Sequence, residues 1–272
     1  MVSQEQRRRQ LAREKFLRQQ QRRTSARRKS RMRNSVIASV LAVIVIGVVV
    51  IYTTGALKND AKANASSQTT PSATPTSKAP DPCEKAAAGS VKKLSWKKEP
   101  AMTIDTSADY TMKLATTCGD IDIALKTAAA PHTVNSFDFL ASKGYFDHTK
   151  CHRLTTNGIY VLQCGDPTGT GSGGPGYTIP DENLKDKSLK GGVYPAGTIA
   201  MANTGQKHTG GSQFFLVYQD SQLPASYTPF GTVDAAGLKV LKKIAAAGES
   251  TGAGDGAPNA TVVINKATVT KS

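Results

Sequence analysis

The chain has 272 residues and a formal net charge of +15, a strong basic excess for its length. The excess lies at one end, because residues 1–34 contain thirteen Lys and Arg against two Glu, a balance of +11. The other 238 residues carry only +4, which excludes a basic surface spread over the whole chain. Residues 1–34 therefore form a basic arm of the kind that binds nucleic acid or acidic lipid.

An uncharged segment follows the arm directly. No charged residue occurs between Arg33 and Lys58, a stretch of 24 residues, which is enough to cross a hydrocarbon layer of about 30 Å as a helix. A cleaved signal peptide is the alternative, but its apolar run is usually only about 7–15 residues long. Here the apolar run extends from Val36 to Tyr52. We therefore predict a transmembrane helix over residues 35–57.

The charge flanking this helix predicts its orientation and the partner of the arm. Residues 1–34 are expected in the cytoplasm and everything after the helix outside, so the localisation is a single-pass cell-membrane protein. In that setting the arm contacts anionic lipid headgroups, and nucleic acid is not expected as a partner.

Residues 58–82 contain no Val, Ile, Leu, Met or aromatic residue, so they have nothing with which to build a core. We predict an extracytoplasmic, disordered linker over residues 58–106, its last part transitional. A globular domain over residues 107–272 follows, which is long enough for a single core.

Four cysteines, Cys83, Cys118, Cys151 and Cys164, all lie beyond the predicted helix. An even number in an oxidising compartment allows two disulfides, and four cysteines allow three pairings. We prefer a Cys151–Cys164 bond, because these residues flank one predicted hairpin. Buried free thiols are the alternative.

The domain is a series of strands with two helices. A helix is predicted to start at Pro131 and stop at Gly144, and a second covers residues 235–248. The strand-like runs are 110–125 around a Cys-Gly-Asp turn, 151–166 around the turn "TTNG", 197–202, 212–218, 229–233 and 260–269. Seven or eight strands with two helices exclude a doubly wound α/β fold. They favour a mainly β fold, a closed antiparallel β-barrel capped by two α-helices.

Two short motifs resemble known binding sites, but the residues around them do not support those sites. "GTGSGG" (169–174) matches a dinucleotide-binding pattern, but Pro-Gly follows and no helix begins, so a flexible surface loop is the better interpretation. "HTKCH" (148–152) resembles a zinc site, yet histidines four residues apart share a face only on a helix; we predict a structural histidine and no metal. No histidine lies in a recognisable nucleophile context, so nothing supports a hydrolase.

One constellation remains. It comprises "CHRL…VLQCGD" from Cys151, "MANTG…GGSQFF" from Met201 and "SQLPASYTPFG" from Ser221. Taken singly, these residues are explained as core aromatics and a surface arginine. In this order and spacing they resemble the cyclophilin family of peptidyl-prolyl cis/trans isomerases, from Tyr110 to the C-terminus. The resemblance implies a closed eight-stranded antiparallel barrel with two helices, and no cofactor.

The resemblance also implies roles for individual residues. Arg153 is the catalytic donor to the prolyl nitrogen, and Gln163 orients it. The residues implied in substrate binding are Tyr160, Val161, Ala202, Asn203, Gln213, Phe215, Leu223 and Tyr227. Arginine suits the central role because it is always charged and presents planar, rigid donors.

This sequence departs from the family pattern in four places. The turn between Arg153 and Gln163 has two more residues than in common members, and Tyr160 with Val161 stand, within one residue, where Phe and Met are usual. Gln222 replaces a frequent Trp, and Tyr227 replaces a frequent His. The missing Trp predicts weak binding of cyclosporin-type inhibitors.

We therefore predict a peptidyl-prolyl cis/trans isomerase of a membrane-anchored bacterial subgroup, whose clients are proline-containing polypeptides. It would assist the folding of secreted or cell-envelope proteins. The alternatives are a catalytically weak Pro-peptide-binding or chaperone module tethered to the membrane, and an interaction protein in which the basic arm carries the function.

Overall fold

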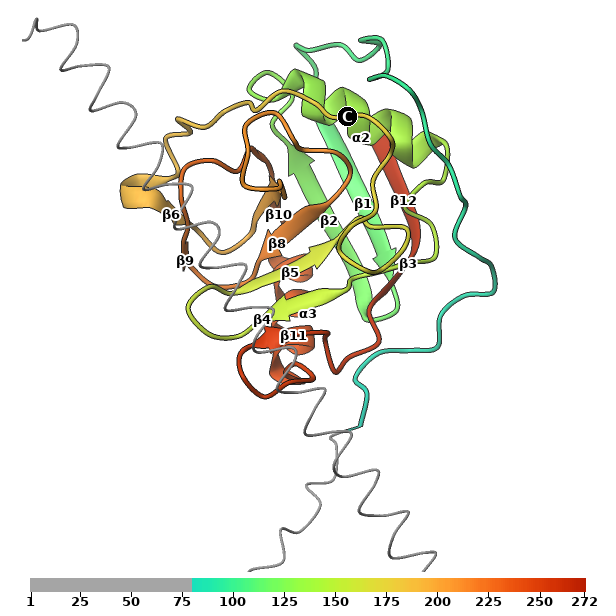
Figure 1. Ribbon diagram of the computed structural model, residues 1–272, viewed down its shortest axis with the longest axis vertical. Coiled ribbons are helices and arrows are strands. Elements are labelled where there is room, and N and C mark those ends of the chain that lie inside the picture. Colours follow the sequence, from blue (N-terminus) through green and yellow to red (C-terminus); the bar gives the residue numbers. More distant parts are fainter. Residues whose placement is uncertain (1–79) are drawn as a thin grey trace, which may run out of the picture. The chain divides into compact units, whose positions relative to one another are not determined.

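The computed structural model describes residues 80–272 (Figure 1). The predicted basic arm (1–34), the predicted transmembrane helix (35–57) and residues 58–79 of the predicted linker lie outside the described residues. Among the residues that are described, no helix has the length and apolar content needed to cross a membrane.

The described chain is mainly β, with two α-helices. The helices are α2 (Pro131–Ser142) and α3 (Ala235–Ala246), and a short 3-10 helix, η1, covers Lys190–Gly192. The strands are β1 (Tyr110–Thr116), β2 (Gly119–Leu125), β3 (Thr149–Lys150), β4 (Arg153–Thr155), β5 (Val161–Cys164), β6 (Val193–Tyr194), β7 (Thr198–Met201), β8 (Phe214–Val217), β9 (Ser221–Gln222), β10 (Pro229–Val233), β11 (Asp255–Gly256) and β12 (Val263–Lys271).

Ten of these strands form one curled antiparallel sheet in the order β11-β4-β5-β8-β7-β10-β2-β1-β12-β3. The prediction of eight strands in a closed barrel therefore needs correction, because the ladder ends at β11 and β3. Both end strands have two residues, too few to leave an alternation in the sequence. The chain itself crosses the opening between β3 and β4. There the Cys151 N–H donates to the Val262 carbonyl, and the His152 N–H donates to the Gln163 carbonyl.

The two helices begin where the sequence predicts and cover different parts of the sheet (Figure 1). Pro131 occupies the first turn of α2, and α3 is capped by the Asp234 carboxylate, which accepts the Gly237 N–H at 2.7 Å. From α2, the fully buried Phe137 contacts the rings of Phe146, Phe214 and Phe230. This aromatic group anchors α2 to the main core.

Residues 80–106 lie against the domain although they contain no helix or strand (Figure 1). A disulfide joins Cys83 to Cys118 in the β1–β2 turn. Trp96 lies edge-on to Phe139, with ring centroids 5.0 Å apart, and Ile104 is buried. The described part of the segment predicted as a linker is therefore a strap packed on the domain.

The central strands have side chains buried on both faces, which determines where the site lies. Along β8, Phe214 and Leu216 enter the main core, whereas Phe215 and Val217 join a second, smaller cluster with Val161. Side chains alternate between the faces of a strand, so one run "FFLV" supplies both clusters. The second cluster forms the base of the site.

Candidate active site

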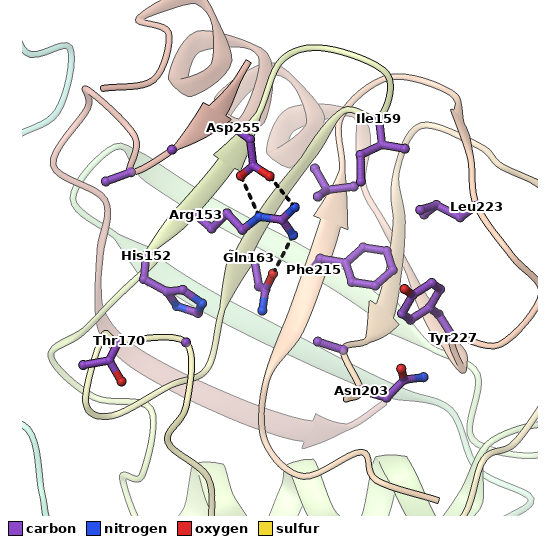
Figure 2. Close-up of a pocket in the computed structure, with 15 residues that line it drawn as sticks. His152, Arg153, Ile159, Gln163, Thr170, Asn203, Phe215, Leu223, Tyr227 and Asp255 are labelled. Carbon is purple, nitrogen blue, oxygen red and sulfur yellow. Dashed lines mark hydrogen bonds and ion pairs between the residues drawn. The ribbon is translucent and has the colours of Figure 1, made fainter. Parts of the chain in front are cut away.

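A cavity of about 530 Å³ lies over the second apolar cluster (Figure 2). Ten site residues are expected from the sequence, and eight of them line this cavity: Arg153, Val161, Gln163, Ala202, Asn203, Phe215, Leu223 and Tyr227. They come from β4, β5, β8 and the loops after β7 and β9. The fold thus brings together residues that are as far apart in sequence as Arg153 and Tyr227.

Arg153 begins β4 and is the only arginine in residues 35–272. Its Nε and Nη2 donate to the two carboxylate oxygens of Asp255, both at 2.7 Å, and its Nη1 donates to Gln163 Oε1 at 3.2 Å (Figure 2). The hydrogen-bonded carboxylate raises the pKa of Arg153 further above its usual value, and the arginine lowers the pKa of Asp255. The guanidinium is therefore a permanent cation with a defined orientation.

Gln163 lies opposite Arg153 in the β4–β5 ladder, so the period of the strands places the two side chains on one face. Its amide nitrogen donates to Gln213 Oε1 at 2.9 Å, and Gln213 donates in turn to the Gly173 carbonyl at 2.9 Å. A chain of amides thus connects the guanidinium to the Gly-rich loop. Gln213 itself lines the adjoining cavity, which also borders Gln163, Ala202 and Asn203.

The base of the cavity is aromatic and apolar. Phe215 is 5% exposed, and its ring lies edge-on to Tyr227 with centroids 5.4 Å apart. Tyr194 holds the Tyr227 segment from below by donating its hydroxyl to the Tyr227 carbonyl at 2.8 Å. Burial raises the pKa of Tyr194 to about 12, so this hydroxyl keeps its proton and remains a donor. With Leu223, the rings of Phe215 and Tyr227 form the apolar part of the cavity lining.

The segment after β7 provides the polar side of the cavity. Asn203 uses its side chain internally, donating from Nδ2 to the Ser226 carbonyl at 2.8 Å and accepting the Gly205 N–H at 2.9 Å. These bonds fix the main chain at Ala202 and Asn203, which is the part that the resemblance assigns to substrate backbone. Ala202 N–H is bonded to the Gln213 carbonyl at 3.0 Å.

Tyr160 is the residue that the structure places elsewhere. Its ring packs against the main core, 5.9 Å from the ring of Tyr218, and Ile159 lines the cavity instead. Ile159 and Val161 are two residues apart and so share a face, which is the opposite face from Tyr160. The prediction of Tyr160 in the pocket is corrected to Ile159, a shift of one residue.

The cysteines near the site form the Cys151–Cys164 disulfide, the pairing preferred from the sequence. The bond joins β5 to the residues just before β4, which places it beside both Arg153 and Gln163. A sequence model of the family "Cyclophilin type peptidyl-prolyl cis-trans isomerase/CLD" matches residues 111–269, which include the whole cavity.

The chain belongs to the cyclophilin family.

Relatives of this cyclophilin include a "Probable peptidyl-prolyl cis-trans isomerase B" of Mycobacterium leprae, 51% identical over 165 residues, or 58% of this chain and 56% of that protein. A Bacillus subtilis "Peptidyl-prolyl cis-trans isomerase B" is 41% identical over 125 residues, or 46% of this chain and 82% of that one. A crystal structure of a Cryptosporidium parvum cyclophilin type isomerase has 25% identity and a TM-score of 0.49, covering 60% of this chain and 99% of that one. The chain spans about half the length of its mycobacterial relatives.

The Gly-rich loop of this cyclophilin is organised around a buried carboxylate. Asp166 accepts the N–H groups of Thr168, Thr170, Gly171 and Gly173 and the Thr168 hydroxyl, at 2.6 to 3.1 Å. Burial by itself raises the pKa of Asp166, but these hydrogen bonds outweigh it and the pKa is lowered. A Cβ at Gly173 would collide with Asp166 Oδ1, so glycine is required there. Backbone N–H groups of the "GTGSGG" segment thus bind the carboxylate of Asp166, which lies just before that segment in the chain.

Two further ionisable residues at this cavity, Asp255 and His152, were not assigned to the site from the sequence. Asp255 lies 102 residues beyond Arg153 in a Gly-rich loop that carries no recognisable motif. His152 lines the cavity, and burial lowers its pKa, which favours the neutral ring. Gln222, at a position where many cyclophilins have Trp, is exposed and donates to the Gly191 carbonyl at 2.8 Å.

Proposed function

We propose that this chain catalyses cis/trans isomerisation of X–Pro bonds in polypeptides, with no covalent intermediate and no cofactor. The observation that carries the proposal is the Arg153 guanidinium held at the edge of the apolar cavity that Phe215 floors (Figure 2). Membership of the cyclophilin family supports it.

The chemistry needs only a rotation. The amide barrier is about 18–20 kcal/mol because the nitrogen lone pair is delocalised into the carbonyl. Twisting the bond returns this lone pair to the prolyl nitrogen, which then becomes a hydrogen-bond acceptor. An N–H of Arg153 directed at that nitrogen stabilises the twisted state and not the planar ground state, which is the condition for lowering a barrier.

The remaining groups hold the substrate while the bond turns. Phe215, Leu223 and Tyr227 enclose the proline ring in a pocket whose shape is fixed by edge-on ring contacts. The main chain at Asn203 positions the substrate backbone, and Gln163 accepts one further hydrogen bond from the guanidinium. The prolyl side is thus immobilised and the preceding carbonyl rotates.

We further propose that the domain works outside the cell membrane, on secreted or cell-envelope proteins. The uncharged residues 34–57 behind a basic arm support an anchor. Two disulfides join the four cysteines, and disulfides persist in oxidising compartments. Uncatalysed X–Pro isomerisation takes tens to hundreds of seconds, which makes it a slow step for newly exported chains.

The activity is tested with the full-length chain in a mild detergent. Two-dimensional NMR exchange on a blocked Ala-Ala-Pro-Phe peptide measures the cis/trans rate directly. Arg153→Ala should lower kcat/KM by about 10²- to 10³-fold, the usual cost of removing one transition-state donor. Arg153→Lys keeps the charge but loses the planar fork, so it should recover little of the rate.

The outcomes separate the candidate functions. A wild-type chain that leaves the spontaneous rate unchanged but shifts the peptide resonances on binding would be a Pro-peptide-binding module. An Arg153→Ala variant as fast as wild type would refute the role of Arg153 and leave the activity standing.

The proposed topology needs its own experiment. Alkaline phosphatase, which is active only outside the cytoplasm, is fused after residue 34 and after residue 79 and expressed in bacteria. Activity of the second fusion alone supports the proposal. A membrane-extracted fusion that has lost its N-terminal epitope tag would instead show a cleaved signal peptide.

A further inference from the structure

The Arg153–Asp255 contact uses the guanidinium in a specific way. Of its five N–H donors, two are bound to the Asp255 carboxylate and one to Gln163 within the described residues. The carboxylate takes the edge formed by Nε and Nη2, and one N–H of Nη1 and one of Nη2 remain. These two donors are available to a substrate, and their direction follows from how Asp255 holds the opposite edge (Figure 2).

Little else in the described chain fixes this side chain. The Arg153 side chain is 39% exposed, so packing does not enclose it, and the Gln163 bond is long at 3.2 Å. An arginine side chain has many accessible rotamers, which would spread the guanidinium over several positions. Within residues 80–272, the paired bonds to Asp255 are the shortest hydrogen bonds of Arg153 and its only bidentate contact.

Asp255 is in turn held by its loop. The Glu249 carboxylate accepts the Thr251 and Gly254 N–H groups, at 2.6 and 2.8 Å, and so closes the loop that precedes β11. The Gly254 carbonyl accepts the Thr156 N–H at 2.9 Å, and Asp255 pairs with Thr155 of β4. The loop is thus docked on Thr155 and Thr156, where β4 ends and the turn to β5 begins.

We propose that Asp255 is a positioning residue for catalysis, which orients the Arg153 guanidinium so that its two remaining N–H groups face the proline pocket. This inference rests on the isomerase activity proposed above and adds a residue to it.

The Asp255 carboxylate has two opposing effects on the reaction rate, and the larger effect determines whether its removal slows or speeds the reaction. It partly neutralises the cation, but the attraction between two solvent-exposed charges is weak in water, so the Arg153 donor is weakened little. Misplacement of a catalytic group by about 1 Å costs about 100-fold in rate. Removal of the carboxylate should therefore slow the reaction rather than speed it.

The test compares Asp255→Asn, Asp255→Ala and Asp255→Glu in the full-length chain, by NMR exchange on the same blocked peptide. The matched control is Asp120→Asn, because Asp120 pairs with Lys113 outside the cavity and its side chain is 53% exposed against 56% for Asp255. Thermal unfolding of each variant verifies the fold, since exposed ion pairs contribute little to stability.

The expected result is a fall in kcat and in kcat/KM together, by about 10- to 100-fold for Asp255→Asn and Asp255→Ala, with KM within about twofold. Asp255→Glu should recover part of the rate, because it restores a carboxylate, and Asp120→Asn should match wild type. An Asp255→Asn variant as fast as wild type or faster, or one that raises KM alone, overturns the inference. A wild-type chain without activity overturns the proposed function as well.

Discussion

The hydrogen bonds around Asp166 predict a large loss of stability for Asp166→Asn. The asparagine amide can be placed in two orientations. In the one that keeps more hydrogen bonds, its carbonyl accepts the N–H groups of Thr170, Gly171 and Gly173, and its NH₂ faces the Thr168 N–H. An orphaned buried donor costs about 1–3 kcal/mol, and three charge-assisted bonds become neutral at about 1 kcal/mol each. The free energy of unfolding should fall by about 4 to 6 kcal/mol.

Urea unfolding followed by the fluorescence of Trp96 measures this loss, because Trp96 is the only tryptophan and packs on Phe139. The control is Asp105→Asn, the same change at a half-exposed carboxylate that also accepts from backbone and side chain, and it should cost much less. A loss below about 1 kcal/mol for Asp166→Asn would refute the reasoning, since one orphaned donor alone exceeds it.

The pH dependence gives a second check on the same carboxylate. The folded-state pKa of Asp166 is lowered, so the charged form contributes stability that is present above the unfolded pKa of about 3.9 and is lost as the pH falls through the folded value. The difference between wild type and Asp166→Asn should therefore be largest near neutral pH and shrink below about pH 4.

Two other predictions concern the hairpin. Ile159→Ala should raise KM for the peptide, because Ile159 lines the cavity. Tyr160→Ala should leave KM unchanged and lower the unfolding free energy by about 2 kcal/mol or more, because Tyr160 packs on the main core. The reverse pattern in the exchange assay and in urea unfolding would place Tyr160, and not Ile159, in the pocket. Replacing Cys151 and Cys164 by serine should cost about 3 kcal/mol, the loop-closure entropy of a 13-residue separation, and a urea midpoint equal to wild type would contradict it.

Local pattern in the sequence was enough for much of this molecule. Pro131 starts α2, and the run "FFLV" was recognisable as a strand although all four residues are buried. The site residues Arg153, Gln163 and Phe215 were found through a resemblance over three segments, and the cavity contains all three. These features depend on residue periodicity and on motifs that each lie within a short segment of the chain.

The features that were missed depend on contacts between distant segments. Asp255 has no local signal, because its partner lies 102 residues away and an aspartate in a Gly-rich loop is ordinary. β3 and β11 have two residues each and exist only through their neighbours. Tyr160 was misplaced because the length of the turn decides which face of β5 each residue takes, and a difference of one residue exchanges the faces.

The bond between Cys83 and Cys118 has a mechanical consequence for the N-terminal strap. Any tension on the chain before residue 83 passes through the sulfurs into the β1–β2 turn, so residues 84–106 bear no load and are not peeled from the surface. Reduction of that bond would move the point of attachment along the chain. Each strap residue released would then add about 3.3–3.6 Å of extended chain ahead of the fold, so the length of that chain depends on this one covalent bond.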